Sequence, residues 1–402
     1  MKEHASHLPF LMASADSLYF SHLAKNQKLL IIANDSVNAR RIHDEIIFFA
    51  PTVKCTIFPD TEILPYERTT PQKDIIALRL KTLSQMHNNL LDVVIISSST
   101  LMVRLCPKEY LYGRQFSLKV GTAINLQHLK EQLVKSDYTL TTTVYEPGEF
   151  AVRGGIIDIM PMGTKQIVRI ELFDNEIESL ALLEPQTKQL INKIDAFELI
   201  PAREYPTDPQ SLKHFAVKFA TEFNQPQYQY LLREINNAIL PAGSEFYLPL
   251  FFDETATILD YLDDSWQVVY QNNLSDILLS HWHEINRRYE LYNHQYSCLT
   301  PGKLFIPGDQ IISKIKQNYK RHIIGKPDCT LNKYTFLPLP DISVNNKEHH
   351  PMAKLDQFYQ SFKGKIVLTT DSVGRTEILR QTLSSYNINC KIIDSLTVIS
   401  TN

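Results

Sequence analysis

The chain has 402 residues, and at about 150 residues per domain this length predicts two or three domains. Hydrophobic residues make up 44% and charged residues 21%, a balance typical of a folded globular protein and not of a disordered one. The 41 basic and 44 acidic residues give a net charge of −3, so the bulk charge does not indicate a strongly basic nucleic-acid-binding domain. No apolar run is long enough for a membrane span and the first residues lack a signal peptide's apolar stretch, so we expect a cytoplasmic location.

The patterns of catalytic and metal-binding residues are weak. The five cysteines are far apart and form no Cys-x-x-Cys pair, so we expect reduced thiols, most of them buried. His281 and His283 are two positions apart, a spacing that does not bring side chains together on a helix. Asp60, Glu62 and Glu67 are in a proline-containing loop, which favours a solvated connection over an acid–base pair. We therefore predict neither a metal site nor catalytic residues.

Glycine usage bears directly on nucleotide binding. A Walker A loop needs a glycine, four residues and then Gly-Lys-Ser/Thr, because bare backbone N–H groups surround the phosphates. Three Gly-Lys pairs occur among the 12 glycines, at 302–303, 325–326 and 364–365, and none has the first glycine or the final hydroxyl residue. No two glycines stand in Gly-x-Gly spacing, which the Rossmann fingerprint requires. The sequence therefore predicts that this chain binds no nucleotide and needs no cofactor.

The first hundred residues alternate short apolar runs with amphipathic stretches. Residues 28–33 and 92–96 are typical of buried strands, and residues 37–49 are typical of a helix that follows a capping turn. A further helix is predicted to begin at Thr70-Pro71, and another to run from Ser97 through Leu105. This order predicts an α/β layer in which helices cover a parallel sheet.

Beyond this layer the pattern changes twice. Residues 116–199 alternate in the period of strands and contain turn residues, which predicts an inserted β-rich domain. After residue 201 the chain becomes helical and mixed, and the apolar runs at 247–252 and 266–270 are predicted to return as strands of the first sheet. Residues 303–333 hold seven basic residues against two acidic ones, which favours a solvated helix face over a nucleic-acid contact.

The C-terminal part begins a new unit. Residues 352–362 and 374–383 are predicted to be helices, and residues 365–369 a strand between them. This stretch is too short to bury a core of its own, so we expect the chain to be part of a longer protein.

Residues 168–174 are the most informative stretch for function. In a strand, Arg169 and Phe173 point to one face while the apolar residues between them point to the other. Arg153 ends the preceding strand beside a glycine pair, where a strand end can present it outward. Arginine and aromatic residues on an exposed sheet face are typical of protein-binding hot spots. The alternative is that Phe173 is ordinary core and that both arginines pair with nearby carboxylates.

Several longer motifs resemble those of the N-terminal region of bacterial transcription-repair coupling factors, with the same order and spacing along nearly the whole chain. These motifs are LPYE at 64–67, PQKD at 71–74, LMVRLCP at 101–107, GEF at 148–150, PMG at 161–163, FDNEI at 173–177, PAREYPTD at 201–208, PAG at 241–243 and PLFF at 249–252. The related excision-repair helicase UvrB has a similar layout, in which a β domain that docks on UvrA splits a helicase-like domain.

This resemblance implies a degenerate helicase-like (RecA-like) α/β body split by a β-rich insertion. It implies that residues 1–112 and 201–335 form the body, 113–200 the UvrA-binding domain, and 336–402 a linker and the start of a third domain. In UvrB a P-loop precedes the second strand, whereas residues 11–17 here contain neither glycine nor lysine. The positions that match the family's UvrA contacts are Arg153, Arg169 and Phe173.

The resemblance also implies what the full-length protein does. It would be an ATP- and Mg²⁺-dependent translocase on double-stranded DNA that displaces stalled RNA polymerase, through C-terminal domains beyond this chain. One of those domains would cover the UvrA surface until the motor engages DNA. This chain itself would bind UvrA during nucleotide excision repair and would not be an enzyme. Two alternatives stay open, a DNA-dependent ATPase in the helicase-like body and a DNA-binding module at residues 303–333.

Overall fold

The computed structural model describes residues 5–393 except for 12, 238, 327–339 and 345–348. The described chain divides into two compact units. The larger unit holds residues up to 330, apart from residues 11–15, which group with the smaller C-terminal unit.

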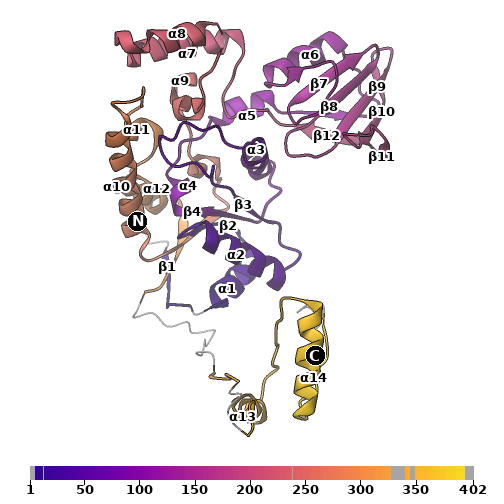
Figure 1. The fold of residues 1–402 in the computed structure, drawn as a ribbon, viewed down its shortest axis with the longest axis vertical. Coiled ribbons are helices and arrows are strands. Elements are labelled where there is room, and N and C mark those ends of the chain that lie inside the picture. The colour runs from indigo at the N-terminus through magenta and orange to yellow at the C-terminus, as the bar shows by residue number, and fades with distance from the viewer. Residues whose placement is uncertain (1–4, 12, 238, 327–339, 345–348, 394–402) are drawn as a thin grey trace. The chain divides into compact units, whose positions relative to one another are not determined.

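A six-stranded parallel sheet forms the centre of the larger unit (Figure 1). Its order is β1-β14-β13-β2-β4-β3. The strands are β1 (Ala5–Leu8), β2 (Lys28–Ala33), β3 (Cys55–Phe58), β4 (Val93–Ser97), β13 (Trp266–Gln271) and β14 (Lys320–Ile324). Every residue of β4 is buried, as expected for a parallel sheet covered on both faces. The predicted parallel α/β architecture is therefore confirmed.

Helices cover both faces of this sheet. Helices α1 (Ala15–Ala24) and α2 (Ser36–Phe49) lie on one side and α3 (Lys73–His87) lies on the other (Figure 1). Asp35 caps α2 by accepting a hydrogen bond from the backbone N–H of Asn38 at 2.7 Å. Helix α3 begins at Lys73 and not at Pro71, and helix α4 (Ser98–Leu101) ends before the predicted Leu105.

A β-rich insertion separates two parts of this body. It follows helix α5 (Lys108–Arg114), and its main sheet has the order β11-β10-β9-β8-β7-β6. The strands are β6 (Thr139–Leu140), β7 (Glu149–Arg153), β8 (Ile156–Met160), β9 (Ile167–Phe173), β10 (Glu176–Leu183) and β11 (Leu190–Ile194). A second, two-stranded sheet pairs β5 (Phe116–Lys119) with β12 (Ala196–Leu199). Helix α6 (Leu126–Lys135), which the strand pattern did not predict, buries Leu129 and Leu133.

The segment that returns from the insertion to the body, residues 209–261, contains more helices than predicted. It contains α7 (Pro209–Glu222), η1 (Pro226–Tyr228), α8 (Gln229–Asn236), η2 (Ser244–Tyr247), α9 (Leu248–Phe251) and η3 (Ile258–Tyr261). The predicted strand at 247–252 is therefore wrong. Pro249 has no N–H and suits a first helical turn, where no N–H partner is needed. Phe251 stacks on Phe215 of α7 with ring centroids 4.1 Å apart, so the apolar run fills an aromatic core.

The basic stretch near residue 303 agrees with the predicted solvated helix face at Lys303 and Lys316, which are exposed, but it also contributes a strand. It follows helix α10 (Leu274–Tyr292) and contains α11 (Pro301–Leu304), α12 (Gly308–Asn318) and the central strand β14. Two of its lysines pair with acids of other elements, Lys303 with Glu222 and Lys314 with Asp260. One of the seven basic residues, Lys333, lies outside the described residues.

Among its described residues, the smaller unit has the helices α13 (Ala353–Ser361) and α14 (Val373–Ser385). This unit has a small core, formed by Met352, Leu355, Leu383 and Ile388. The expectation that the stretch is too short to bury a core of its own is therefore wrong. The predicted strand at 365–369 is absent from the described structure. A strand needs a hydrogen-bonded neighbour, and no strand forms among the described residues of this unit.

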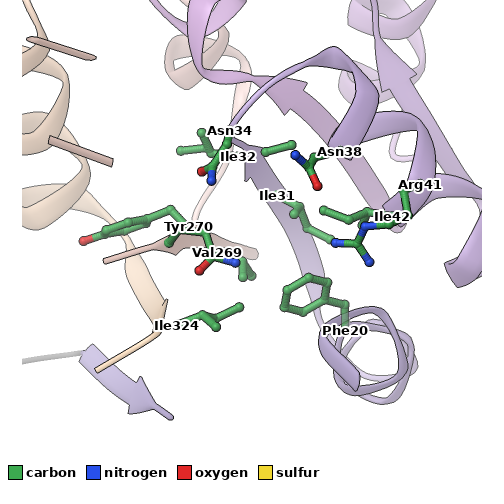
Figure 2. Close-up of a pocket in the computed structure, with 12 residues that line it drawn as sticks. Phe20, Ile31, Ile32, Asn34, Asn38, Arg41, Ile42, Val269, Tyr270 and Ile324 are labelled. Carbon is green, nitrogen blue, oxygen red and sulfur yellow. The ribbon is translucent and has the colours of Figure 1, made fainter. Parts of the chain in front are cut away.

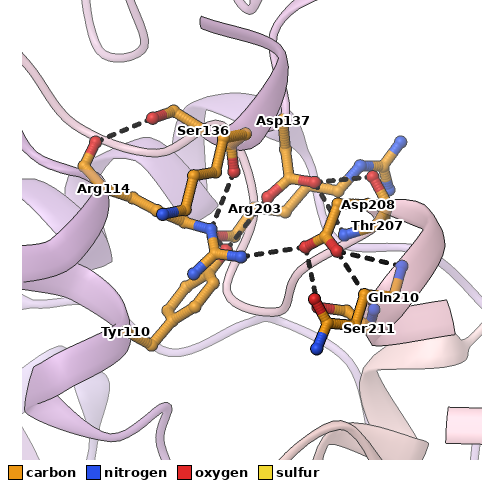
Figure 3. A network of polar contacts seen from close by, with 10 residues as sticks. Tyr110, Arg114, Ser136, Asp137, Arg203, Thr207, Asp208, Gln210 and Ser211 are labelled. Atoms are coloured by element: carbon orange, nitrogen blue, oxygen red, sulfur yellow. Dashed lines mark hydrogen bonds and ion pairs between the residues drawn. The ribbon is translucent and has the colours of Figure 1, made fainter. Parts of the chain in front are cut away.

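A polar network joins the insertion to the body where the chain enters and leaves it (Figure 3). Asp137, just after α6, accepts hydrogen bonds from the backbone N–H and hydroxyl of Thr207 at 2.7 and 2.6 Å. The hydroxyl of Tyr110 in α5 donates to the same carboxylate at 3.1 Å. Arg114 pairs with Asp208, the N-cap of α7, at 3.0 Å. These bonds therefore connect α5, the end of α6 and the start of α7.

A buried ion pair anchors the same junction to the parallel sheet. Arg79 of α3 donates to Glu204 at 2.7 Å and to the backbone carbonyl of Pro59 at 2.9 Å. Its guanidinium lies 4.6 Å from the ring centroid of Phe58, at the end of β3. Arg79 is only 1% exposed and Glu204 only 6%. A charge at this depth needs its partner, because water cannot replace it.

The first prediction concerns this pair. Glu204→Ala leaves the Arg79 guanidinium buried without its carboxylate, so we expect the free energy of unfolding to fall by about 3 kcal/mol. Urea denaturation of both proteins measures this difference. The control is Glu284→Ala, which removes a solvent-exposed pair with Arg287 and should lower the free energy of unfolding far less. Equal losses in the two variants would contradict the anchoring role.

The second prediction concerns pH. Burial raises the pKa of the Asp137 carboxyl above its usual range, despite the hydrogen bonds from Thr207. Because the folded pKa is above the unfolded one, this group stabilises the fold fully at pH values below the unfolded pKa of about 3.9. That stabilisation is lost as the pH rises through the folded pKa. Between pH 4 and 7, wild type should therefore lose stability relative to Asp137→Asn in urea denaturation, and a constant difference would contradict the shift.

Candidate protein-interaction surface

The register of the inserted sheet determines which side chains share a face. Along β9, alternate residues point the same way, so Arg169, Glu171 and Phe173 lie on one face. Two transverse rows on this face follow from the strand pairing: Ala151, Asp158, Arg169 and Ala181 form one, and Arg153, Ile156, Glu171 and Ser179 form the next. The structure thus brings the three predicted site residues together on one face, which we call the interaction surface.

Arg153 is exposed at the end of β7. One of its terminal nitrogens donates to the backbone carbonyl of Thr142 at 2.7 Å and to the hydroxyl of Thr143 at 3.0 Å. The next residue, Gly154, has a φ of +62°, which turns the chain into β8 directly beside this side chain. Within the described part of the chain Arg153 forms no ion pair, so its charge is available to a partner.

Arg169 is held in a fixed orientation. Its guanidinium donates twice to the carboxylate of Asp158 on the neighbouring strand, at 2.7 and 2.9 Å. This hydrogen bonding raises the pKa of Arg169 above its usual value, against the opposing effect of partial burial. The alternative prediction, that both arginines pair with carboxylates, is therefore right for Arg169 and wrong for Arg153. The small side chains of Ala151 and Ala181 flank the ion pair in its row.

Phe173 is an exposed aromatic residue at the end of β9. Its side chain is 69% exposed, which excludes the alternative that it belongs to the core. Asp174, with a φ of +54°, begins the turn into β10. In the neighbouring row Ile156 is 37% exposed. Apolar side chains beside an arginine on an open face are the composition of a binding hot spot. The sequence analysis did not name Ile156 as a candidate for this surface. Its pairing with Arg153 and Glu171 places it on the same face.

The other candidates from the sequence lie in the body, outside the inserted sheet. His281 is paired with the hydroxyl of Ser98 at 3.0 Å, and burial lowers its pKa. The residues that the structure describes contain no group of three or more metal-ligating side chains. Asp60 accepts hydrogen bonds from Ser99 and Thr100 at 3.2 and 2.7 Å, so the interpretation of its loop as simply solvated is wrong at this position.

A small hollow opens at the carboxyl edge of β2 and β13 (Figure 2). Its volume is about 30 Å³, and Phe20, Ile42 and Arg41 line it. Arg41 binds Asp16, the second residue of α1, at 2.7 Å and also binds Glu45. A space of this size has room for one or two water molecules.

Two further sequence expectations concern the cysteines and the membrane. Of the cysteines that the structure describes, Cys106 is buried, Cys55 and Cys298 are half-buried and Cys390 is exposed. The expectation that most are buried is therefore wrong. Within the described ranges, every helix is too short or too polar to cross a membrane.

Two family models match parts of this chain, and one of them covers the interaction surface. Residues 116–205 match the family model described as the UvrB interaction domain, and residues 358–402 match the model of the MFD D3 domain. The first match contains the whole interaction surface.

Curated relatives match over most of the chain. A transcription-repair-coupling factor from Haemophilus influenzae is 29% identical and covers 96% of this chain, and one from Escherichia coli is 30% identical and covers 90%. A transcription-repair-coupling factor from Bacillus subtilis is 23% identical over 96% of the chain. The chain spans about a third of the length of these relatives. The chain corresponds to the N-terminal region of transcription-repair-coupling factors.

Proposed function

We propose that this chain binds UvrA through the interaction surface and so recruits it during transcription-coupled nucleotide excision repair. The observation that carries the proposal is the exposure of Arg153 and Phe173 on the same sheet face as the oriented Arg169. The match of residues 116–205 to a UvrB interaction domain supports the choice of partner. A residue set of this kind binds by desolvation of an aromatic ring and by charge-assisted hydrogen bonds.

The surface is suited to binding without rearrangement. The Asp158 carboxylate holds Arg169 in place, and the loop at Thr142 and Thr143 supports Arg153 through one nitrogen. Both side chains therefore lose less conformational freedom on binding than free arginines would. The body would serve as a scaffold for this surface, and the chain would have no catalytic activity of its own.

We further propose that the remaining activities belong to parts of the full-length protein outside this chain. These are an ATP- and Mg²⁺-dependent motor on double-stranded DNA and the displacement of stalled RNA polymerase. The match to the relatives' N-terminal region supports this division, because the chain covers about a third of their length. We propose residues 113–200 as the UvrA-binding domain and a cytoplasmic location for the whole protein.

The third prediction tests the surface residue by residue. Arg153→Ala, Arg169→Ala and Phe173→Ala should each raise the Kd for UvrA at least about tenfold, because truncation of a hot-spot residue costs about 2 kcal/mol or more. Calorimetric titration of UvrA into each variant measures the effect. Circular dichroism should stay unchanged for Phe173→Ala, since an exposed ring contributes little to folding.

Matched controls separate this surface from general surface effects. Tyr230→Ala removes another exposed aromatic residue, on α8 of the body, and Arg287→Ala removes an exposed arginine of α10. Both should bind UvrA like wild type. Unchanged UvrA affinity in all three surface variants would refute the proposed site. A specific thermal shift with ATP, or DNA binding that falls steeply with salt, would favour the two alternative functions.

A further inference from the structure

A second potential binding site lies in the helicase-like body, at the carboxyl ends of β3 and β4. Ligands of open parallel sheets bind outside the carboxyl ends of the strands. A cavity of about 290 Å³ occupies this position, between the loop after β3, helices α4 and α10, and the η2–α9 turn. Its volume is close to the lower limit of about 300 Å³ for small-molecule sites.

Apolar and aromatic side chains form most of the cavity wall. Phe246 and Phe305 contribute rings, and Leu248 and Ile285 contribute aliphatic surface. Tyr66 fixes the two rings from behind, because its own ring is 6.1 Å from that of Phe246 and 6.2 Å from that of Phe305. The faces of aromatic rings attract cations.

The cavity also contains a carboxylate without a complete set of partners. The Glu245 side chain lies among its lining residues, and one of its two oxygens is buried with no hydrogen-bond partner among the described residues. The other oxygen is 3.4 Å from the hydroxyl of Tyr205, a long hydrogen bond. Burial raises the pKa of Glu245 and the nearby Glu204 carboxylate adds to this effect, while a hydrogen bond to its own backbone N–H opposes it. A buried carboxylate oxygen without a hydrogen-bond donor lowers the stability of the fold unless a ligand supplies the donor.

The charges around the cavity show which kind of ligand fits. Four carboxylates line it, those of Asp60, Glu204, Glu245 and Glu284, against the guanidinium groups of Arg79 and Arg104. Arg79 is already bound to Glu204, and Arg104 donates to the carbonyl of Gly302 at 2.9 Å. Glu284 pairs with Arg287, which lies outside the lining, and Arg104 has a buried Nε with no hydrogen-bond partner among the described residues. The unpaired carboxylates of Asp60 and Glu245 therefore outnumber the one guanidinium without a carboxylate partner, which favours a cation.

The loop that covers the cavity is held in a strained conformation. Glu62 and Tyr66 have φ values of +58° and +67°, in the left-handed region that non-glycine residues rarely adopt. Arg288 of α10 holds the loop by donating to the carbonyl of Pro65 at 2.8 Å, and Tyr66 donates to the carbonyl of Leu299 at 3.0 Å. Backbone strain of this kind persists only where surrounding contacts enforce it, and it is frequent at ligand-binding loops.

We propose that this cavity binds a small organic cation, with an ammonium or guanidinium head on Glu245 and an apolar body against Phe246 and Phe305. The site is separate from the interaction surface and does not depend on UvrA binding. The probe that tests it is 2-phenylethylammonium, and its neutral analogue 2-phenylethanol serves as the ligand control. Saturation-transfer NMR detects binding to the 402-residue chain, and calorimetry gives the Kd.

We expect 2-phenylethylammonium to bind at least about tenfold more tightly than 2-phenylethanol, because only the cation donates a charge-assisted hydrogen bond. Glu245→Gln should remove this preference, whereas Glu178→Gln, on the exposed surface of the insertion, should retain it. Val103→Phe fills the cavity from α4's C-terminal side and should abolish binding of both probes. If Glu245→Gln does not fold, Val103→Phe still tests whether the probes bind in this cavity. Equal binding of the two probes, no binding of either, or full binding to Val103→Phe would overturn the proposal.

Discussion

The buried contact between Arg79 and Glu204 is the interaction on which the arrangement of the larger unit depends. Glu204 lies just after the inserted sheet, and Arg79 lies on the helix that covers β3. The pair therefore joins the returning chain to the parallel sheet at a point that water does not reach. Because an unpaired charge at this depth is costly, the two partners keep each other in position.

The Asp137 network adds a second connection at the same junction. It joins the exit of α6 to Thr207, and Arg114 joins α5 to Asp208. Polar contacts thus attach the insertion to the body at several points, which also include the ion pair between Lys73 of α3 and Glu146. None of these contacts uses Arg153, Arg169 or Phe173. This separation explains how exposed residues such as Phe173 can be devoted to binding. A protein interior demands apolar packing, whereas an open sheet face accepts a solvent-exposed ring at little cost in stability.

The sequence was most predictive where hydrophobic periodicity is strong. The apolar runs of β2, β4 and β13 were recognisable as buried strands, and the two-residue period of β9 correctly placed Arg169 and Phe173 on one face. Strand β14 was missed because it begins with Lys320-Arg321-His322, which conceals a central strand. The apolar run around Pro249 resembles a buried strand, but its proline suits the first turn of a helix.

The sequence of helix α6 contains a helical pattern inside a stretch that otherwise alternates like strands. Leu126, Leu129 and Leu133 follow helical spacing, and Asn125 caps the helix by accepting from His128 at 3.0 Å. Other features depend on tertiary contact and were beyond sequence reasoning. Arg79 and Glu204 are 125 positions apart, and nothing in either local pattern marks them as partners. The exposure of Phe173 and the incomplete hydrogen bonding of Glu245 likewise appear only once the chain is folded.

The location of the UvrA contact is the central claim, and hydrogen–deuterium exchange with and without UvrA tests it most directly. We expect UvrA to slow exchange at the two turns beside the interaction surface, at Gly154-Gly155 and Asp174-Asn175, and along β9. The parallel sheet and helices of the body should exchange at unchanged rates. Protection confined to the body, with the two turns unaffected at saturating UvrA, would contradict the assignment.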